Sequence, residues 1–287
     1  MARPGTTDSG TDDMVYKAIR YDVVDGVATL LLSRPSRRNA WTGRMHTEYR
    51  HALQRAELDL TVRVVVVAGD PDGRAFCVGG DADALEGHAR RGAYDPGTAP
   101  DLARPGYGIA PEFDADFAFQ FGLRCPVIAA VNGAAAGVGL AVACFADLCF
   151  VADDARLTTA HGRLGLPAEY GLSWLLPHRV GLTRAADLLL TSRIFTGTEA
   201  AAWGLALEAL PASDVLDRAT AYASSLVTDV APSSLAATRR QLYTDLHGDA
   251  ASSVNEANRL LDQMMATDDY VEGVTALRER RPPDFGH

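Results

Sequence analysis

The sequence predicts an α/β fold built around a mainly parallel β-sheet. In the N-terminal part of the chain, short runs of β-branched residues alternate with stretches of helical periodicity, which is typical of βα units. From Thr183 onward the pattern is almost purely helical. The chain has 287 residues, of which 47% are hydrophobic, and this is enough to build one sizeable core.

The expected elements follow one another in a regular order. Strands are expected at residues 27–33, 62–69, 126–133 and 147–155. Apolar residues at helical spacing predict a helix over 42–59, and a second helix is expected over 137–146. Further helices are expected at 184–192, 232–247 and 253–280.

These patterns divide the chain near residue 205. We expect an α/β core over 14–205, a helical region over 206–287 and a disordered, polar leader over 1–13. The segment 87–108 is rich in Gly, Pro and Ala and shows no clear period. A long loop of this kind inside a domain is usually functional or disordered, and the sequence leaves both alternatives open.

Composition and charge exclude several classes of function. The net charge of −10 argues against nucleic acid as a partner. No apolar run approaches the roughly 20 residues that a membrane span requires, and the N-terminus lacks the apolar centre of a secretory signal. The four cysteines are irregularly spaced, which favours buried free thiols in a reducing, cytoplasmic compartment.

A glycine-rich segment, "VNGAAAGVGLAVACFAD" (residues 131–147), follows the third expected strand. Gly137 and Gly139 match the opening of the dinucleotide fingerprint G-x-G-x-x-G, but Val142 fills the third glycine position. A nicotinamide-dependent oxidoreductase is therefore only a weak alternative. The segment carries no acidic side chain before Asp147, so any chemistry within it must come from the backbone.

A second glycine signal lies in "GRAFCVGGDADAL" (residues 73–85), after the second expected strand. It places Gly79 and Gly80 at the start of an expected helix, and Asp81 is suited to cap that helix. Two strand-to-glycine-to-helix junctions can direct backbone amides at one oxygen, which is how an oxyanion hole is assembled. The positive end of the helix near Gly139 would favour negative charge there.

These segments resemble a known superfamily. "LSRPSRRNAW" (32–41), "GRAFCVGGDADAL", "CPVIAAVNGAAAGVGLAVACFADL" (125–148) and "RERRPPDF" (278–285) are similar, in this order, to the crotonase or enoyl-CoA hydratase/isomerase superfamily. The resemblance runs from about Tyr16 to Phe285. It implies a repeated ββα spiral core and a C-terminal helical region that packs homotrimers, often paired as homohexamers.

The resemblance also implies the ligand and the oxyanion site. The substrate is an acyl-CoA, with coenzyme A as part of the thioester and with no permanently bound cofactor and no metal. The thioester carbonyl would lie between the backbone N–H groups of Gly80 and Val138. Because an enolate places negative charge on this oxygen, two preorganised amides stabilise it more than they stabilise the substrate.

Coenzyme A would lie near the segment after the first strand. The resemblance assigns phosphate contacts to Arg37 and Arg38 and adenine contacts to the backbone carbonyls of Ala40 and Val78. Arginine suits phosphate because it is always charged and donates hydrogen bonds in a fork.

The acid–base residues depart from the superfamily pattern. Typical hydratases carry two glutamates, and the matching positions here are Ala141 and His161. Glu169 lies eight residues after His161, where isomerases of the superfamily often carry an acid. Apolar neighbours such as Leu166 and Leu172 would raise the pKa of this carboxyl group.

We therefore expect an acyl-CoA-processing enzyme that isomerises or hydrates an enoyl-CoA, with Glu169 and His161 as acid–base groups. Histidine titrates near neutral pH, which suits that role. Glu169 could instead form a structural ion pair with Arg163 or Arg179. The alternatives for the whole protein are a non-catalytic acyl-CoA-binding protein or another crotonase reaction, such as thioester hydrolysis or decarboxylation.

Overall fold

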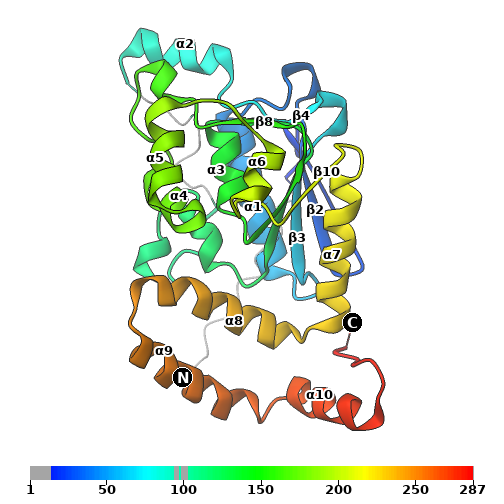
Figure 1. Ribbon diagram of the computed structural model, residues 1–287. Helices are drawn as coiled ribbons and strands as arrows, with labels where there is room; N and C mark the ends of the chain where they lie inside the picture. Colours follow the sequence, from blue (N-terminus) through cyan, green and yellow to red (C-terminus); the bar gives the residue numbers. More distant parts are fainter. Residues whose placement is uncertain (1–13, 94–96, 98–102, 287) are drawn as a thin grey trace, which may run out of the picture.

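The computed structural model describes residues 14–93, 97 and 103–286 (Figure 1). The expected leader over 1–13 lies outside the described residues. Among the described residues, the strands form a six-stranded sheet and a four-stranded sheet. In the part of the chain that the structure covers, no helix is long and apolar enough to cross a membrane.

The larger sheet has the order β1-β2-β3-β5-β7-β10. Its strands are β1 (Ile19–Val24), β2 (Val27–Leu32), β3 (Val64–Gly69), β5 (Val127–Val131), β7 (Leu148–Ala152) and β10 (Glu208–Leu210). β1 and β2 pair antiparallel and the other pairs are parallel, so the expected mainly parallel sheet is confirmed. β3 and β5 are buried along their whole length, as expected where both faces are covered.

The strands of the smaller sheet lie in the same relative order as their sequence neighbours in the larger sheet. Its strands are β4 (Ala75–Cys77), β6 (Ala134–Ala136), β8 (Arg156–Thr158) and β9 (Phe195–Thr196), in the order β4-β6-β8-β9. β4, β6 and β8 each follow a strand of the larger sheet and pair with one another in parallel. A helix follows each pair, so the chain builds the repeated ββα spiral that the sequence predicts.

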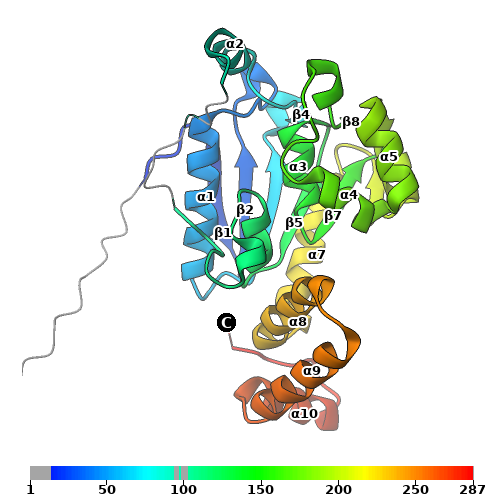
Figure 2. The ribbon, with the colours of Figure 1, turned by 90° about the vertical axis from the view of Figure 1, so that its left-hand side faces the viewer.

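Helices cover the larger sheet and extend beyond it. The helices of the core region are α1 (Gly43–Leu58), α2 (Ala82–Arg91), α3 (Val138–Cys144), α4 (Leu172–Val180), α5 (Leu182–Thr191), α6 (Gly197–Ala202) and α7 (Val215–Asp229). Of these, α1, α3, α6 and α7 pack against strands, and α4 packs against α3 and α5. Figure 2 shows α1 on one side of the sheet and α3, α4 and α5 on the other. Thr42 caps α1 by accepting a hydrogen bond from the N–H of Met45.

Short 3₁₀ turns connect several elements. They are η1 (Pro35–Arg37), η2 (Pro71–Gly73), η3 (Pro111–Phe113), η4 (Ala118–Gly122), η5 (His161–Leu164) and η6 (Asp245–His247). The segment expected as a loop over 87–108 is partly helical, because α2 continues to Arg91. Asp81 caps α2 as expected, and Gly92 ends it with a φ of 65°. Residues 94–96 and 98–102 of this segment lie outside the described residues.

The core continues past residue 205, the boundary expected from the sequence. β10 adds the last strand of the larger sheet, and α7 packs against β2, β3, β5 and β7. The helices that lie beneath the core in Figure 1 are α8 (Pro232–Thr244), α9 (Ala250–Met264) and α10 (Asp268–Glu279). The helical pattern expected over 253–280 corresponds to two helices, because Thr267 caps a new helix by accepting from the N–H of Tyr270.

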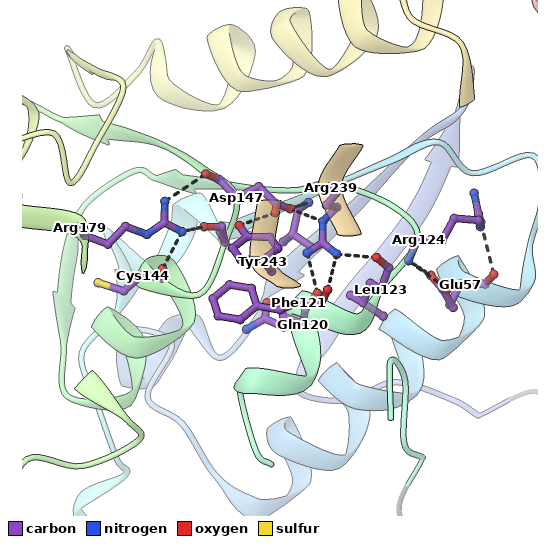
Figure 3. Close-up of polar contacts among 12 residues, drawn as sticks. Glu57, Gln120, Phe121, Leu123, Arg124, Cys144, Asp147, Arg179, Arg239 and Tyr243 are labelled. Carbon is purple, nitrogen blue, oxygen red and sulfur yellow. Dashed lines mark hydrogen bonds and ion pairs between the residues drawn. The ribbon is translucent and has the colours of Figure 1, made fainter. Parts of the chain in front are cut away.

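A buried polar network joins α8 to the core (Figure 3). The carboxylate of Asp147 accepts hydrogen bonds from Arg239 Nε at 2.9 Å, from the Tyr243 hydroxyl at 2.6 Å and from the Val127 N–H at 2.6 Å. The Arg239 guanidinium also donates to three backbone carbonyls of the segment 120–123. Because the Arg239–Asp147 pair is almost fully buried, its charges depend on one another for solvation.

The four cysteines are free, as the sequence predicts, and three of them are buried. Burial raises the pKa of the Cys77 thiol to about 12. This thiol is therefore protonated at neutral pH and is unsuited to act as a nucleophile.

Candidate active site

The two glycine junctions lie side by side. β4 and β6 pair in parallel, with Cys77 opposite Ala135, so the turns that follow them occupy the same edge of the smaller sheet. The backbones are in close contact there, because a Cβ atom at Gly139 would lie 2.2 Å from the carbonyl oxygen of Cys77. A Cβ atom at Gly79 would lie 3.2 Å from the carbonyl oxygen of Ala136. The absence of a side chain at Gly139 therefore allows α3 to approach β4 this closely.

The first junction is held by Trp41. The Trp41 N–H donates to the Gly79 carbonyl at 2.8 Å, and the Trp41 carbonyl accepts from the Asp81 N–H at 2.9 Å. This forms an isolated parallel bridge between Trp41 and Gly80. The bridge is formed by the Gly79 carbonyl and the Asp81 N–H, which belong to the residues before and after Gly80. The N–H of Gly80 itself therefore faces away from Trp41.

The second junction opens α3. Gly137 has a φ of 49° and donates its N–H to the Thr158 carbonyl at 3.1 Å. Val138 is the first residue of α3, where backbone N–H groups have no partner within the helix. The N–H groups of Gly80 and Val138 therefore lie at one edge of the smaller sheet.

If the N–H groups of Gly80 and Val138 form the oxyanion hole expected from the sequence, Gly139→Ala should lower turnover by about 10²-fold, with acyl-CoA binding less affected. The new methyl group would collide with the carbonyl of Cys77, so α3 must move away from β4 and carry the N–H of Val138 with it. Steady-state kinetics and a melting curve check this. Gly273→Ala is the matched control, because a Cβ atom there meets nothing within 4 Å. Unchanged turnover of Gly139→Ala would show that the spacing of the junctions is unimportant.

His161 is buried at the start of η5. Its Nε2 atom lies 3.0 Å from the Leu189 carbonyl near the end of α5. Since a carbonyl can only accept, Nε2 carries the hydrogen, and Nδ1 is the acceptor in the neutral ring. Nδ1 is buried and has no hydrogen-bond partner among the described residues.

The strained backbone of Ala160 determines how His161 is oriented. Ala160 has φ 62° and ψ −31°, and the His161 N–H donates to the Thr159 carbonyl at 2.8 Å, which closes a rare γ-turn. The next residue is fixed as well, because the Gly162 N–H donates to the hydroxyl of the fully buried Ser192 at 3.0 Å. Strain of this kind in a non-glycine residue is typical of functional sites.

Glu169 lies between η5 and α4 and is partly buried. Burial raises the pKa of this carboxyl group, although nearby His161 and a hydrogen bond from Tyr170 oppose the increase. Of the expected apolar neighbours, Leu172 is fully buried but Leu166 is 42% exposed, so Leu166 does not provide the desolvation.

The alternative ion pair with Arg179 is not formed. The Arg179 guanidinium donates to the carbonyls of Cys144 and Ala146, at the C-terminal end of α3 (Figure 3). No ion pair between Arg163 and Glu169 occurs within the described part of the chain. At the position of the first expected glutamate, Ala141 is fully buried in α3.

The structure separates the two arginines assigned to phosphate. Arg37 pairs with Asp83 of α2 at 3.0 Å, on the same side as Gly80. Arg38 instead lines a cavity of about 610 Å³ together with Arg74 and Arg156. Arg38 adopts a left-handed φ of 51° at the end of η1.

Arg34, rather than Arg37 or Arg38, makes the contacts nearest to the first glycine junction. It pairs with Asp81 at 2.8 Å and donates to the Ala40 carbonyl at 2.7 Å. The Ala40 carbonyl, expected at the adenine end, is thus already an acceptor for Arg34. Val78 is partly exposed next to the junction. Within the described residues, no group of His, Cys, Asp and Glu side chains is arranged to hold a metal ion.

The ββα repeats, with two glycine junctions at one sheet edge and a helical C-terminal region, define a protein of the crotonase superfamily. A family model described as enoyl-CoA hydratase/isomerase matches residues 22–287. The chain belongs to the enoyl-CoA hydratase/isomerase family.

Three relatives show the range of that family. A probable enoyl-CoA hydratase of Rhodobacter capsulatus is 34% identical over 272 residues, covering 95% of this chain and 99% of the relative. The 1,2-epoxyphenylacetyl-CoA isomerase of Escherichia coli is 31% identical and covers 92% of this chain and 96% of its own. The crystal structure of a probable enoyl-CoA hydratase/isomerase from Mycobacterium abscessus superposes with a TM-score of 0.80 at 35% identity, covering 93% and 98% of the two chains.

Proposed function

We propose that the protein isomerises the double bond of an enoyl-CoA by proton transfer through a thioester enolate. The observation that carries this proposal is the partly buried Glu169, a carboxyl group whose pKa is raised by burial, on the segment that also holds the buried His161. Ala141 supplies no second carboxylate for holding a water molecule. One carboxylate beside an imidazole suits a reaction that removes a proton and returns it.

The proton transfer has two steps. The ionised Glu169 takes a proton from the carbon next to the double bond, and the electron pair moves to the thioester oxygen as an enolate. The N–H groups of Gly80 and Val138 bind that oxygen. Protonated Glu169 then returns the proton at a different carbon, so the double bond has moved and no atom has been gained or lost.

Hydration is the second candidate, and the unpartnered Nδ1 of His161 favours it. A water molecule between this nitrogen and Glu169 would be oriented by one group and deprotonated by the other. The relatives support either reaction, since one is named an enoyl-CoA hydratase and another an isomerase of a CoA thioester. For this chain, we place Arg34 and Arg37 beside the phosphates of coenzyme A, because both lie next to α2.

The assembly we propose is a homotrimer or a dimer of trimers. The helices α8 to α10 expose several large apolar side chains, including Leu261, Met265 and Leu277. Apolar surface of this extent on outlying helices is typical of an interface. We place the protein in the cytoplasm, since free cysteines are usual in a reducing compartment.

The proposal predicts how activity depends on pH. Glu169 must be ionised to take a proton, and burial raises its pKa above the ordinary value of 4.5. Turnover should therefore rise as the pH increases through this raised pKa. The midpoint of the acidic limb of the pH profile should lie above the ordinary pKa of glutamate. A pH profile of kcat/KM on a 3-enoyl-CoA measures this limb. A midpoint at or below the ordinary value would exclude Glu169 as the base.

A paired assay tests the function itself. Purified protein is given a 2-enoyl-CoA in water and, separately, a 3-enoyl-CoA. Isomerisation without hydration supports the proposal, whereas fast hydration favours the second candidate and makes His161 the first residue to substitute. If neither substrate reacts while acyl-CoA still binds, the protein is a binding protein or catalyses another thioester reaction.

A further inference from the structure

A group of aromatic side chains lies next to the first glycine junction. Phe117 is at its centre, with ring centroids 6.1 Å from Trp41, 6.4 Å from Phe145 and 5.3 Å from Tyr170. The Trp41 backbone is hydrogen-bonded to Gly79 and Asp81, the residues before and after Gly80. Tyr170 directly follows Glu169 in the sequence. We name these four side chains the aromatic wall. It connects the junction to the acid–base segment.

The two sides of Gly80 differ in polarity. On the side of α2 lie the ion pairs of Arg34 with Asp81 and of Arg37 with Asp83. On the side of the aromatic wall, Phe117 is only 2% exposed. A thioester bound at Gly80 would therefore place its phosphates on the charged side and its acyl group on the aromatic side.

Phe117 is held in an uncommon backbone conformation, with φ 66° and ψ −43°. The preceding residue, Asp116, anchors it to α1. The Asp116 carboxylate accepts from Arg50 Nη1 at 2.6 Å, and His46 Nε2 lies 3.5 Å from the same oxygen. Arg50 and His46 are almost fully buried, whereas the Asp116 side chain is 49% exposed, so water screens their attraction in part. A strained residue persists only where its surroundings fix it, and this cluster does so.

We infer that Phe117, fixed by Asp116, closes the acyl end of the site, so the substrates are CoA thioesters with short acyl groups. This inference rests on the proposed function, because it assumes that the thioester lies at Gly80. It makes Phe117 the residue that determines acyl length and makes Asp116 the residue that positions it. The Phe117 ring packs against both Trp41 and Tyr170.

Binding of saturated thioesters tests this without any chemistry. Isothermal titration of butyryl-CoA and dodecanoyl-CoA gives the ratio of the two affinities for each protein. Phe117→Ala should shift the ratio towards dodecanoyl-CoA by about tenfold or more, since several methylene groups gain a buried place. Asp116→Asn keeps the ring but weakens its anchor, and a smaller shift in the same direction is expected.

Phe113→Ala is the matched control, because Phe113 is equally buried and its ring packs on Phe121. Its ratio should equal that of the wild type. The inference is overturned if neither Phe117→Ala nor Asp116→Asn changes the ratio, or if the wild type already prefers dodecanoyl-CoA as strongly as Phe117→Ala does. A wild type that binds neither thioester overturns the proposed function together with this inference, whereas binding without discrimination overturns the inference alone.

Discussion

Replacing Glu169 with glutamine is expected to lower the turnover of an enoyl-CoA by about 10²–10⁴-fold, the usual contribution of a general acid–base group. Glutamine keeps the shape of the side chain but can neither take nor return a proton. The loss should appear in kcat, because in the proposed mechanism the thioester is held by backbone N–H groups and arginines rather than by Glu169. Steady-state kinetics with a 3-enoyl-CoA measure it, and titration with a saturated acyl-CoA shows whether binding survives.

Stability separates a catalytic role of Glu169 from a structural one. Since burial raises the pKa of this carboxyl group, its charged form is disfavoured in the folded protein at neutral pH. Removing the charge should leave the melting temperature of Glu169→Gln at or above that of the wild type. Glu256→Gln, which alters an exposed pair with Arg259 in α9, should change neither turnover nor stability much. Full activity of Glu169→Gln would exclude this residue from the mechanism.

Arg239→Met is expected to lower the free energy of unfolding by about 3–5 kcal/mol. The substitution leaves the charge of Asp147 buried without its partner and removes the donors to the carbonyls of the segment 120–123. Urea denaturation followed by circular dichroism measures the change. The neighbouring residue offers a control, because Arg240 is exposed on the same helix. Arg240→Met should stay within about 0.5 kcal/mol of the wild type. Equal effects of the two substitutions would mean that the buried pair does not hold α8 to the core.

The long buried strands could be predicted from the sequence because β-branched runs are a local signal. β10 could not, since its three residues, Glu208 to Leu210, carry no such run and are paired only through the tertiary position of β7. The boundary between α9 and α10 was not predicted for a related reason. α9 ends at Met264 and Thr267 caps α10, without any glycine or proline to mark the boundary.

The site was predictable where it is made of consecutive residues. The glycine junctions were found because each is one short segment, and the structure brings them side by side through the parallel pairing of β4 and β6. The orientation of His161 depends on Leu189 and Ser192, which are distant in sequence, so no local pattern could indicate it. The same is true of Phe117, whose backbone conformation depends on packing against other elements.

The oxyanion donors that we propose, the amides of Gly80 and Val138, belong to the main chain, and this affects how the protein can evolve. Among single substitutions, only proline deletes a backbone N–H, so ordinary mutation cannot remove these donors. The side chains around them are free to change, as Ala141 and His161 show against the superfamily pattern. A lineage can thus exchange its proton-transferring groups one at a time while retaining its thioester scaffold. New reactions on this scaffold are separated by few mutational steps, and reactivity that has been lost can be regained by the same short route.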